Sequence, residues 1–96
     1  MEFFRVDHLK RIKKEDLLGK AYKGKSEIIY IITGVENSIG LKAEEIESLA
    51  SGKPKPVILP NDAYIAKEDL DKVRTRFPNT YARITSNIAK RETQKQ

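Results

Sequence analysis

Residues 27–35, EIIYIITGV, constrain the fold more than any other part of the chain. The segment is rich in β-branched and aromatic residues, which is typical of a β-strand. Its apolar positions run without interruption from residue 28 to residue 32, so neither side of the strand is polar. A strand that faces water on one side alternates apolar and polar residues. The segment therefore predicts a central strand that is covered on both faces.

Shorter strands and several helices are expected around this central strand. The strands predicted from composition and turn signals lie at residues 2–6, 20–23, 38–41 and 57–59, with residues 63–65 pairing back after a turn at 60–62. The helical segments predicted from apolar spacing lie at residues 7–19 (one helix or two short turns), 41–52, 67–77 and 80–91. This order predicts one α+β domain, residues 1–91, with a small, mainly antiparallel sheet and two to four packed helices. Residues 92–96 are expected to form a disordered polar tail.

Two of the predicted helices have recognisable termini. In the helix at 41–52, the carboxylates of Glu44, Glu45 and Glu47 suit a solvated first turn, because the helix dipole favours negative charge there. Asn79 or Thr80 is expected to cap the last helix, after Pro78 has ended the preceding one.

The stretch GKAYKGKS matches the P-loop pattern at Gly19, Gly24, Lys25 and Ser26. A P-loop needs a buried strand before the loop and a helix after it, whose N-terminus faces the phosphates. Here the charged segment KKED precedes Leu17, and the strand at 27–35 follows Ser26. The match is therefore interpreted as a lysine-rich β-hairpin, in which Gly24 supplies a turn conformation that other residues resist.

Basic residues gather in two segments of this chain, which has 96 residues and a formal net charge of +5. Lysines and arginines outnumber acids at residues 10–25 and again at 72–95, while the middle of the chain is acidic. A basic balance of this kind favours an anionic partner. In the first segment, Lys20, Lys23 and Lys25 surround the hairpin turn, and Tyr22 among them is a candidate for stacking on a base.

The last predicted helix has an apolar stripe and a polar arc. At 100° per residue, Tyr81, Ile84, Thr85 and Ile88 share the packing side. The opposite arc consists of Arg83, Ser86, Asn87 and Lys90, with Arg91 at its edge. Arginine and asparagine are residue types that read base edges, and lysine suits phosphates. An ordinary amphipathic helix with a solvated basic side remains the alternative.

Composition argues against several classes of function. The chain has no cysteine and His8 is its sole histidine, so neither thiol chemistry nor a transition-metal site is expected. No catalytic constellation is recognisable, and we expect neither enzymatic activity nor a cofactor. No apolar run approaches the roughly 20 residues needed to cross a membrane. The first residues also lack the apolar core of a signal peptide, and a cytoplasmic protein is expected.

These observations lead to two hypotheses from different classes. The first is a small, non-enzymatic basic protein that binds DNA or RNA through Lys20, Lys23, Lys25, Arg83, Asn87, Lys90 and Arg91. The alternative is a protein-interaction module, such as a small inhibitor or adaptor. Such a module docks an acidic protein, or forms a homodimer if the long apolar strand lies at a sheet edge.

Overall fold

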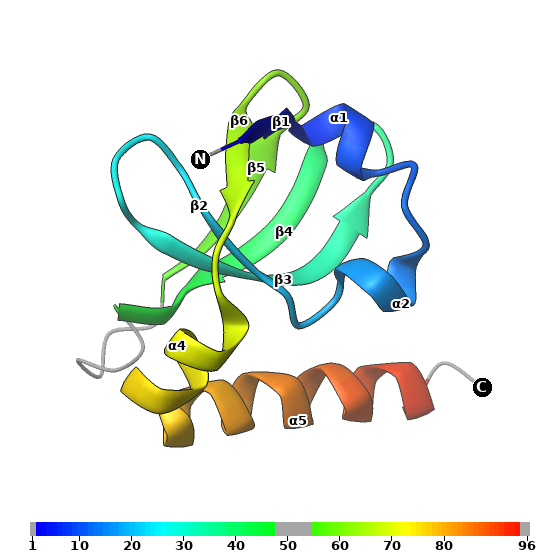
Figure 1. The fold of residues 1–96 in the computed structure, drawn as a ribbon. Helices are drawn as coiled ribbons and strands as arrows, with labels where there is room; N and C mark the ends of the chain where they lie inside the picture. The colour runs from blue at the N-terminus through cyan, green and yellow to red at the C-terminus, as the bar shows by residue number, and fades with distance from the viewer. Residues whose placement is uncertain (1, 48–54, 95–96) are drawn as a thin grey trace.

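The computed structural model describes residues 2–47 and 55–94, with the side chains of 91–94 outside the description. It contains a curled, six-stranded antiparallel sheet with strand order β1-β6-β2-β3-β4-β5 (Figure 1). The strands are β1 (Phe3–Arg5), β2 (Ala21–Lys23), β3 (Ile29–Glu36), β4 (Gly40–Glu45), β5 (Pro56–Pro60) and β6 (Tyr64–Lys67). The helices are α1 (Val6–Leu9), α2 (Lys14–Leu17), α4 (Leu70–Arg76) and α5 (Pro78–Gln94). The predicted small α+β fold is confirmed.

The long apolar segment is the central strand β3, which lies between β2 and β4. Its side chains alternate between two hydrophobic cores because successive residues of a strand point to opposite faces. Ile32 packs in the core inside the curl, and Ile31 packs in the core on the outer face. Both side chains are 0% exposed. The prediction of a strand covered on both faces is confirmed.

The two helical turns near the N-terminus help to close the inner core. Val6 and Leu9 of α1 and Leu17 of α2 are buried there against Tyr22 and Leu41. The sequence left one helix or two short turns open for residues 7–19, and the structure has two turns, α1 and α2.

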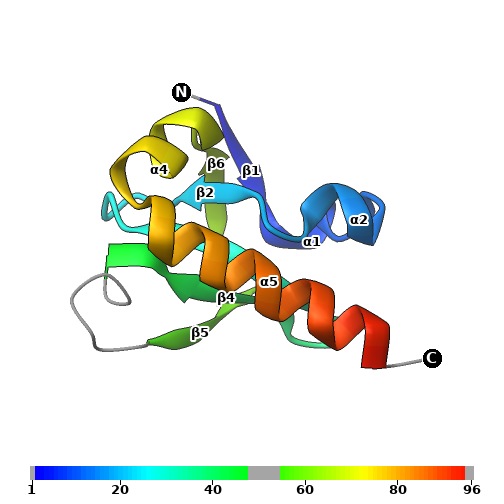
Figure 2. The same cartoon turned by 90° about the horizontal axis from the view of Figure 1, so that it is seen from below.

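The outer face of the sheet is covered by α4 and α5, and Figure 2 shows α5 crossing the sheet. Val73 and Ile84 are buried in the outer core together with Ile31. The packing side predicted for the last helix is therefore confirmed. The predicted cap of α5 is wrong, because the helix already begins at Pro78. Proline suits the first helical position, since that position has no intrahelical partner for an N–H.

The helix predicted at 41–52 is wrong for its first five residues, which form strand β4. Glu44 and Glu45 consequently lie in a strand rather than in a helical first turn. Leu41 and Ala43 point to the inner core, and hydrogen-bonded pairing with β3 and β5 outweighs the helix propensity of the sequence. Glu47 is helical, while residues 48–52 of the prediction lie outside the described residues.

The last strand, β6, pairs with β1 and β2, so the predicted pairing of 63–65 back onto 57–59 is wrong. This insertion leaves β1 and β5 as the edges of the described sheet. The central position of β3 also excludes the idea that the long apolar strand lies at an edge. The actual edges are poor templates for another strand, because β1 has three residues and β5 has prolines at both ends, which lack an N–H.

The hairpin between β2 and β3 differs from expectation in its backbone. Its positive φ, 66°, belongs to Glu27, and Gly24 has no positive φ. The Gly24 carbonyl accepts a hydrogen bond from the Glu27 N–H at 3.1 Å, which closes the turn. Gly24 is therefore not required by its φ angle. At the other end of the chain, α5 extends past Arg91 to Gln94, and residues 95–96 lie outside the description.

Candidate nucleic-acid interface

Helix α5 presents its predicted polar arc to solvent. Its packing side is fixed by Ile84, which is 2% exposed, and by Tyr81, whose hydroxyl donates a hydrogen bond to the Gly19 carbonyl at 3.0 Å. The residues of the opposite arc, all exposed, are Arg83, Ser86, Asn87 and Lys90. Arg83 and Lys90 are two helical turns apart, which is about 10 Å along the axis. This spacing is about three times the 3.4 Å rise between nucleotides of one strand.

The charge of α5 has one sign over most of its length. Between Pro78 and Arg91 the sequence has no aspartate or glutamate. Neither Arg83 nor Lys90 forms an ion pair with any residue in the described ranges. Both cations can therefore bind an anionic partner without breaking an ion pair to a side chain that the structure describes.

A cleft between β2 and α4 brings the two basic segments of the sequence together. Its lining residues are Lys23, Ile29, Glu68, Lys72, Val73 and Arg76, around a volume of about 240 Å³. Lys23 belongs to the first basic segment, whereas Lys72 and Arg76 belong to the second. Lys72 and Arg76 were not predicted from the sequence as binding residues. They line the cleft only because α4 packs beside β2, and no feature of the local sequence indicates this tertiary contact.

Ion pairs partly neutralise this cleft. The Lys23 ammonium lies 3.1 Å from the Glu68 carboxylate, and Arg76 lies 3.8 Å from Glu47. The pKa of Glu68 is lowered mainly because the backbone N–H of Asp69 donates a hydrogen bond to it, and the nearby Lys23 adds to this effect. Glu68 is thus ionised at neutral pH, and Lys72 is the one cation of the cleft that forms no ion pair with a described residue.

Of the remaining residues predicted to bind nucleic acid, only Arg91 belongs to α5. Lys25 lies in the loop after β2, which Figure 1 places far from α5, and its ammonium is 5.8 Å from the centre of the Tyr64 ring. Lys20 is exposed just before β2. The backbone of Arg91 belongs to α5, but its side chain lies outside the description. The seven predicted residues thus fall into separate groups on α5 and along β2 and its loop.

Tyr22 does not stack on a base, because it is 1% exposed in the inner core. Burial also raises the pKa of its hydroxyl. The exposed rings are instead those of Phe3 and Tyr64, which are 38% and 49% exposed. Neither ring was predicted from the sequence to be exposed. Tyr22, which is flanked by lysines, was expected to be more accessible than Tyr64, which has apolar neighbours.

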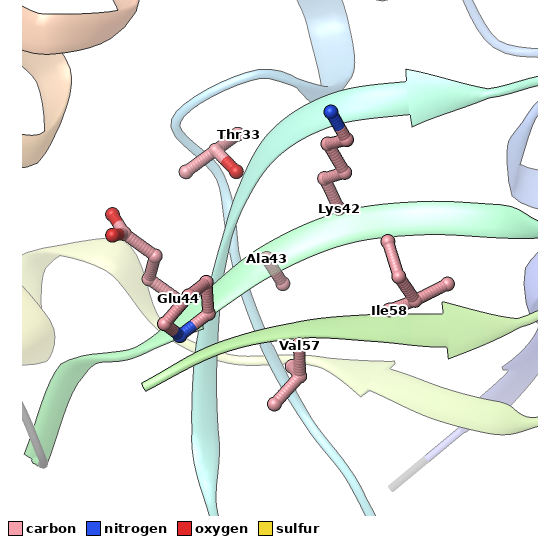
Figure 3. A pocket seen from close by; sticks show the side chains of 7 residues that line it. Thr33, Lys42, Ala43, Glu44, Val57 and Ile58 are labelled. Atoms are coloured by element: carbon pink, nitrogen blue, oxygen red, sulfur yellow. The ribbon is translucent and has the colours of Figure 1, made fainter. Parts of the chain in front are cut away.

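A second depression lies on the outer side of β4 and β5 (Figure 3). It has a volume of about 290 Å³ and is lined by Thr33, Lys42, Ala43, Glu44, Pro56, Val57 and Ile58. Its charged groups are of opposite sign, and Lys42 is paired with Glu36 at 2.9 Å. The depression therefore lacks the excess of positive charge that an anion requires.

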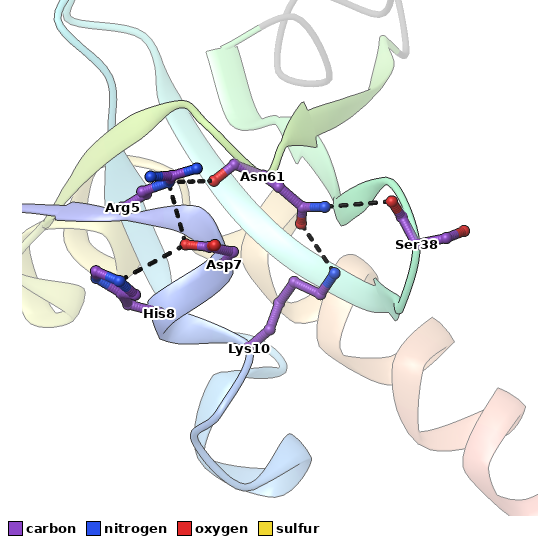
Figure 4. Close-up of polar contacts among 6 residues, drawn as sticks. All are labelled: Arg5, Asp7, His8, Lys10, Ser38 and Asn61. Carbon is purple, nitrogen blue, oxygen red and sulfur yellow. Dashed lines mark hydrogen bonds and ion pairs between the residues drawn. The ribbon is translucent and has the colours of Figure 1, made fainter.

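The polar cluster around His8 ties α1 to neighbouring loops (Figure 4). Asp7 lies 3.2 Å from Arg5 and 3.9 Å from His8. Nearby, the Asn61 side chain accepts a hydrogen bond from Lys10 at 2.9 Å and donates one to the Ser38 carbonyl at 3.2 Å. These contacts join α1 to the β3–β4 and β5–β6 turns. Neither of the two depressions described above includes His8 among its lining residues.

No group of three potential metal ligands occurs within residues 2–47 and 55–94. The helices there are also too short or too polar to cross a membrane. Comparison with protein-family models, curated proteins and solved structures gives no match for this chain.

Proposed function

We propose that this chain is a non-enzymatic, cytoplasmic protein that binds nucleic acid through the exposed arc of α5. The observation that carries the proposal is the arc itself: Arg83, Asn87 and Lys90 are exposed on one side of a helix whose other side is packed on the sheet. The packed side fixes the direction of the cations, so little reorganisation is needed on binding.

The cleft between β2 and α4 supports the same function. Three of its lining residues are cations, Lys23, Lys72 and Arg76. Phosphate contacts dominate the affinity of most nucleic-acid-binding proteins, and each contact releases condensed counterions. Affinity for DNA or RNA should consequently fall steeply as salt concentration rises.

The test is a salt titration of binding to labelled DNA and RNA oligonucleotides. In the double variant Arg83→Ala/Lys90→Ala, the slope of log K against log salt should become shallower by about 2, since two phosphate contacts are lost. A matched control is Arg11→Ala/Lys13→Ala, which removes two exposed cations outside the arc and lowers the net charge equally. This control should keep the wild-type slope to within about half a unit.

Two results would refute the proposal. One is the absence of salt-sensitive binding to either nucleic acid by the wild-type protein. The other is equal weakening in both double variants, because it would mean that net charge alone, and not the arc, drives association. If instead an acidic protein co-purifies in stoichiometric amount without nucleic acid, the interaction-module hypothesis replaces this one.

A further inference from the structure

Two exposed aromatic rings lie on neighbouring strands and on the same face of the sheet. In the β1–β6 pair, Phe4 is opposite Ile65, and both pack toward the inner core. Phe3, opposite Ala66, and Tyr64, opposite Arg5, must therefore point to the outer face. Helices α4 and α5 cover this face over β2 and β3, and they leave Phe3 and Tyr64 exposed.

The two rings are diagonal neighbours. Phe3 pairs with Ala66, and Tyr64 is two residues before Ala66 on the same strand. Diagonal neighbours across an antiparallel pair are about 7–8 Å apart. This is about twice the 3.4 Å rise per nucleotide of a stacked strand, so two nucleotides of one strand that are two positions apart can reach both rings.

Cations border the ring pair. Lys25 sits over the Tyr64 ring at 5.8 Å and has no carboxylate partner among the described residues. Lys23 lies in the same cross-strand row as Phe3, with Ala66 between them. Two strand spacings separate them, about 10 Å. The cleft between β2 and α4 therefore adjoins the aromatic pair. Arg5 also faces outward, but it is held by Asp7 at 3.2 Å.

We propose that Phe3 and Tyr64 form a stacking surface for the bases of single-stranded nucleic acid, with Lys25 contacting the phosphates. The inference rests on the proposed function and specifies its ligand. Bases inside a duplex are already stacked and hidden from such rings, whereas unpaired bases can stack on them. Exposed rings beside cations are the combination that sequence-tolerant single-strand binding uses. The protein should accordingly prefer single strands to duplexes.

Binding of a 20-nucleotide oligothymidylate and of a 20-base-pair duplex tests this. Tyr64→Ala and Phe3→Ala should each weaken single-strand binding by about 5- to 100-fold, with smaller effects on duplex binding. Tyr64→Phe is the matched control, because it keeps the ring and should keep the affinity. Lys25→Ala should weaken binding less and reduce the salt slope by about 1.

Tyrosine emission gives an independent readout, because the chain has no tryptophan and Tyr64 is its exposed tyrosine. Oligothymidylate should quench wild-type emission, and Tyr64→Phe should lose this quenching while it still binds. The stacking proposal is overturned if the wild type binds duplex as tightly as single strand, or if both alanine variants keep wild-type affinity. If the wild type binds no nucleic acid at all, the proposed function fails as well, so the two failures are distinguishable.

Discussion

Gly40 is the position at which a single methyl group should damage this fold most. It begins β4 with φ +147°, a region that side chains rarely adopt, and it is paired with Pro60 of β5. A Cβ built there would lie 1.9 Å from the backbone oxygen of Leu59 and 2.8 Å from its carbonyl carbon. Relief requires the backbone of β5 to move by roughly 1 Å, because real Cβ contacts are not shorter than 3.0 Å.

The cost of Gly40→Ala has two parts. Unfavourable φ contributes about 1–3 kcal/mol, and overpacking against a backbone that cannot rotate away contributes about 1–3 kcal/mol more. A domain of this length has a total stability of about 5–14 kcal/mol. The variant should therefore lose a large fraction of its stability. In a urea titration followed by far-UV circular dichroism, its midpoint should fall by about 2 M.

Gly34→Ala is the matched control for this experiment. Gly34 lies on the neighbouring strand without a positive φ, and the closest atom to its added Cβ is a flexible carbon of the Lys42 side chain at 3.4 Å. Its stability should change by less than about 1 kcal/mol in either direction. Equal midpoints for the two variants would refute the reasoning, since they would mean that β5 yields freely at Leu59.

Three further substitutions test contacts between distant segments. Tyr81→Phe removes the hydrogen bond to Gly19 and should lower the free energy of unfolding by about 1 kcal/mol, visible as a melting temperature reduced by about 5 °C; an unchanged melting temperature would contradict the contact. Asn61→Ala loses two side-chain hydrogen bonds, one to an ammonium, and should cost about 2 kcal/mol in a urea titration; a loss below about 0.5 kcal/mol would mean that water replaces both bonds. The lowered pKa of Glu68 stabilises the protein above its unfolded-state value of 4.5, and this stabilisation is lost as pH falls through the folded-state pKa. Glu68→Gln should consequently lose less stability than the wild type between about pH 6 and pH 3. Identical pH profiles would rule out this role for the Glu68 carboxylate, which accepts a hydrogen bond from the Asp69 N–H and pairs with Lys23.

Local pattern was sufficient to predict β3, α4 and the packing side of α5 from sequence. The uninterrupted apolar run of β3 agrees with its burial on both faces, and the 3.6-residue period of α4 and α5 agrees with the burial of one side of each helix. The strand predicted at 38–41 overlaps only the start of β4, whose remaining residues were assigned to a helix. Lys42, Ala43 and Glu44 favour helices intrinsically, and the strand is enforced by pairing with β3 and β5 on either side. The pairing of β6 with β1 and β2 was also missed, since no local feature specifies a partner that is distant in sequence.

The candidate site divides in the same way. The polar arc of α5 followed from helical periodicity, and the structure confirms that its residues are exposed on one side of the helix. Its role in binding remains a proposal. The accessible aromatic side chains were not predictable from the sequence. The exposure of Tyr64 and the burial of Tyr22 depend on which face of the sheet each ring points to and on what packs against that face. Likewise, Lys23 and Lys72 line the same cleft only because α4 packs beside β2, and the position of α4 depends on the insertion of β6 between β1 and β2.

The insertion of β6 between β1 and β2 also sets an order of events for a chain leaving the ribosome. Strands β2, β3, β4 and β5 follow one another and pair as neighbours, so they can assemble as soon as they emerge. Strand β1 is made first but has no partner until Tyr64–Lys67 has been synthesised. During that interval β2 exposes an open edge and Val6 lacks its bond to Ala63. Contacts this distant in sequence slow folding. The interval is therefore the stage of synthesis at which this chain is most prone to associate with other copies.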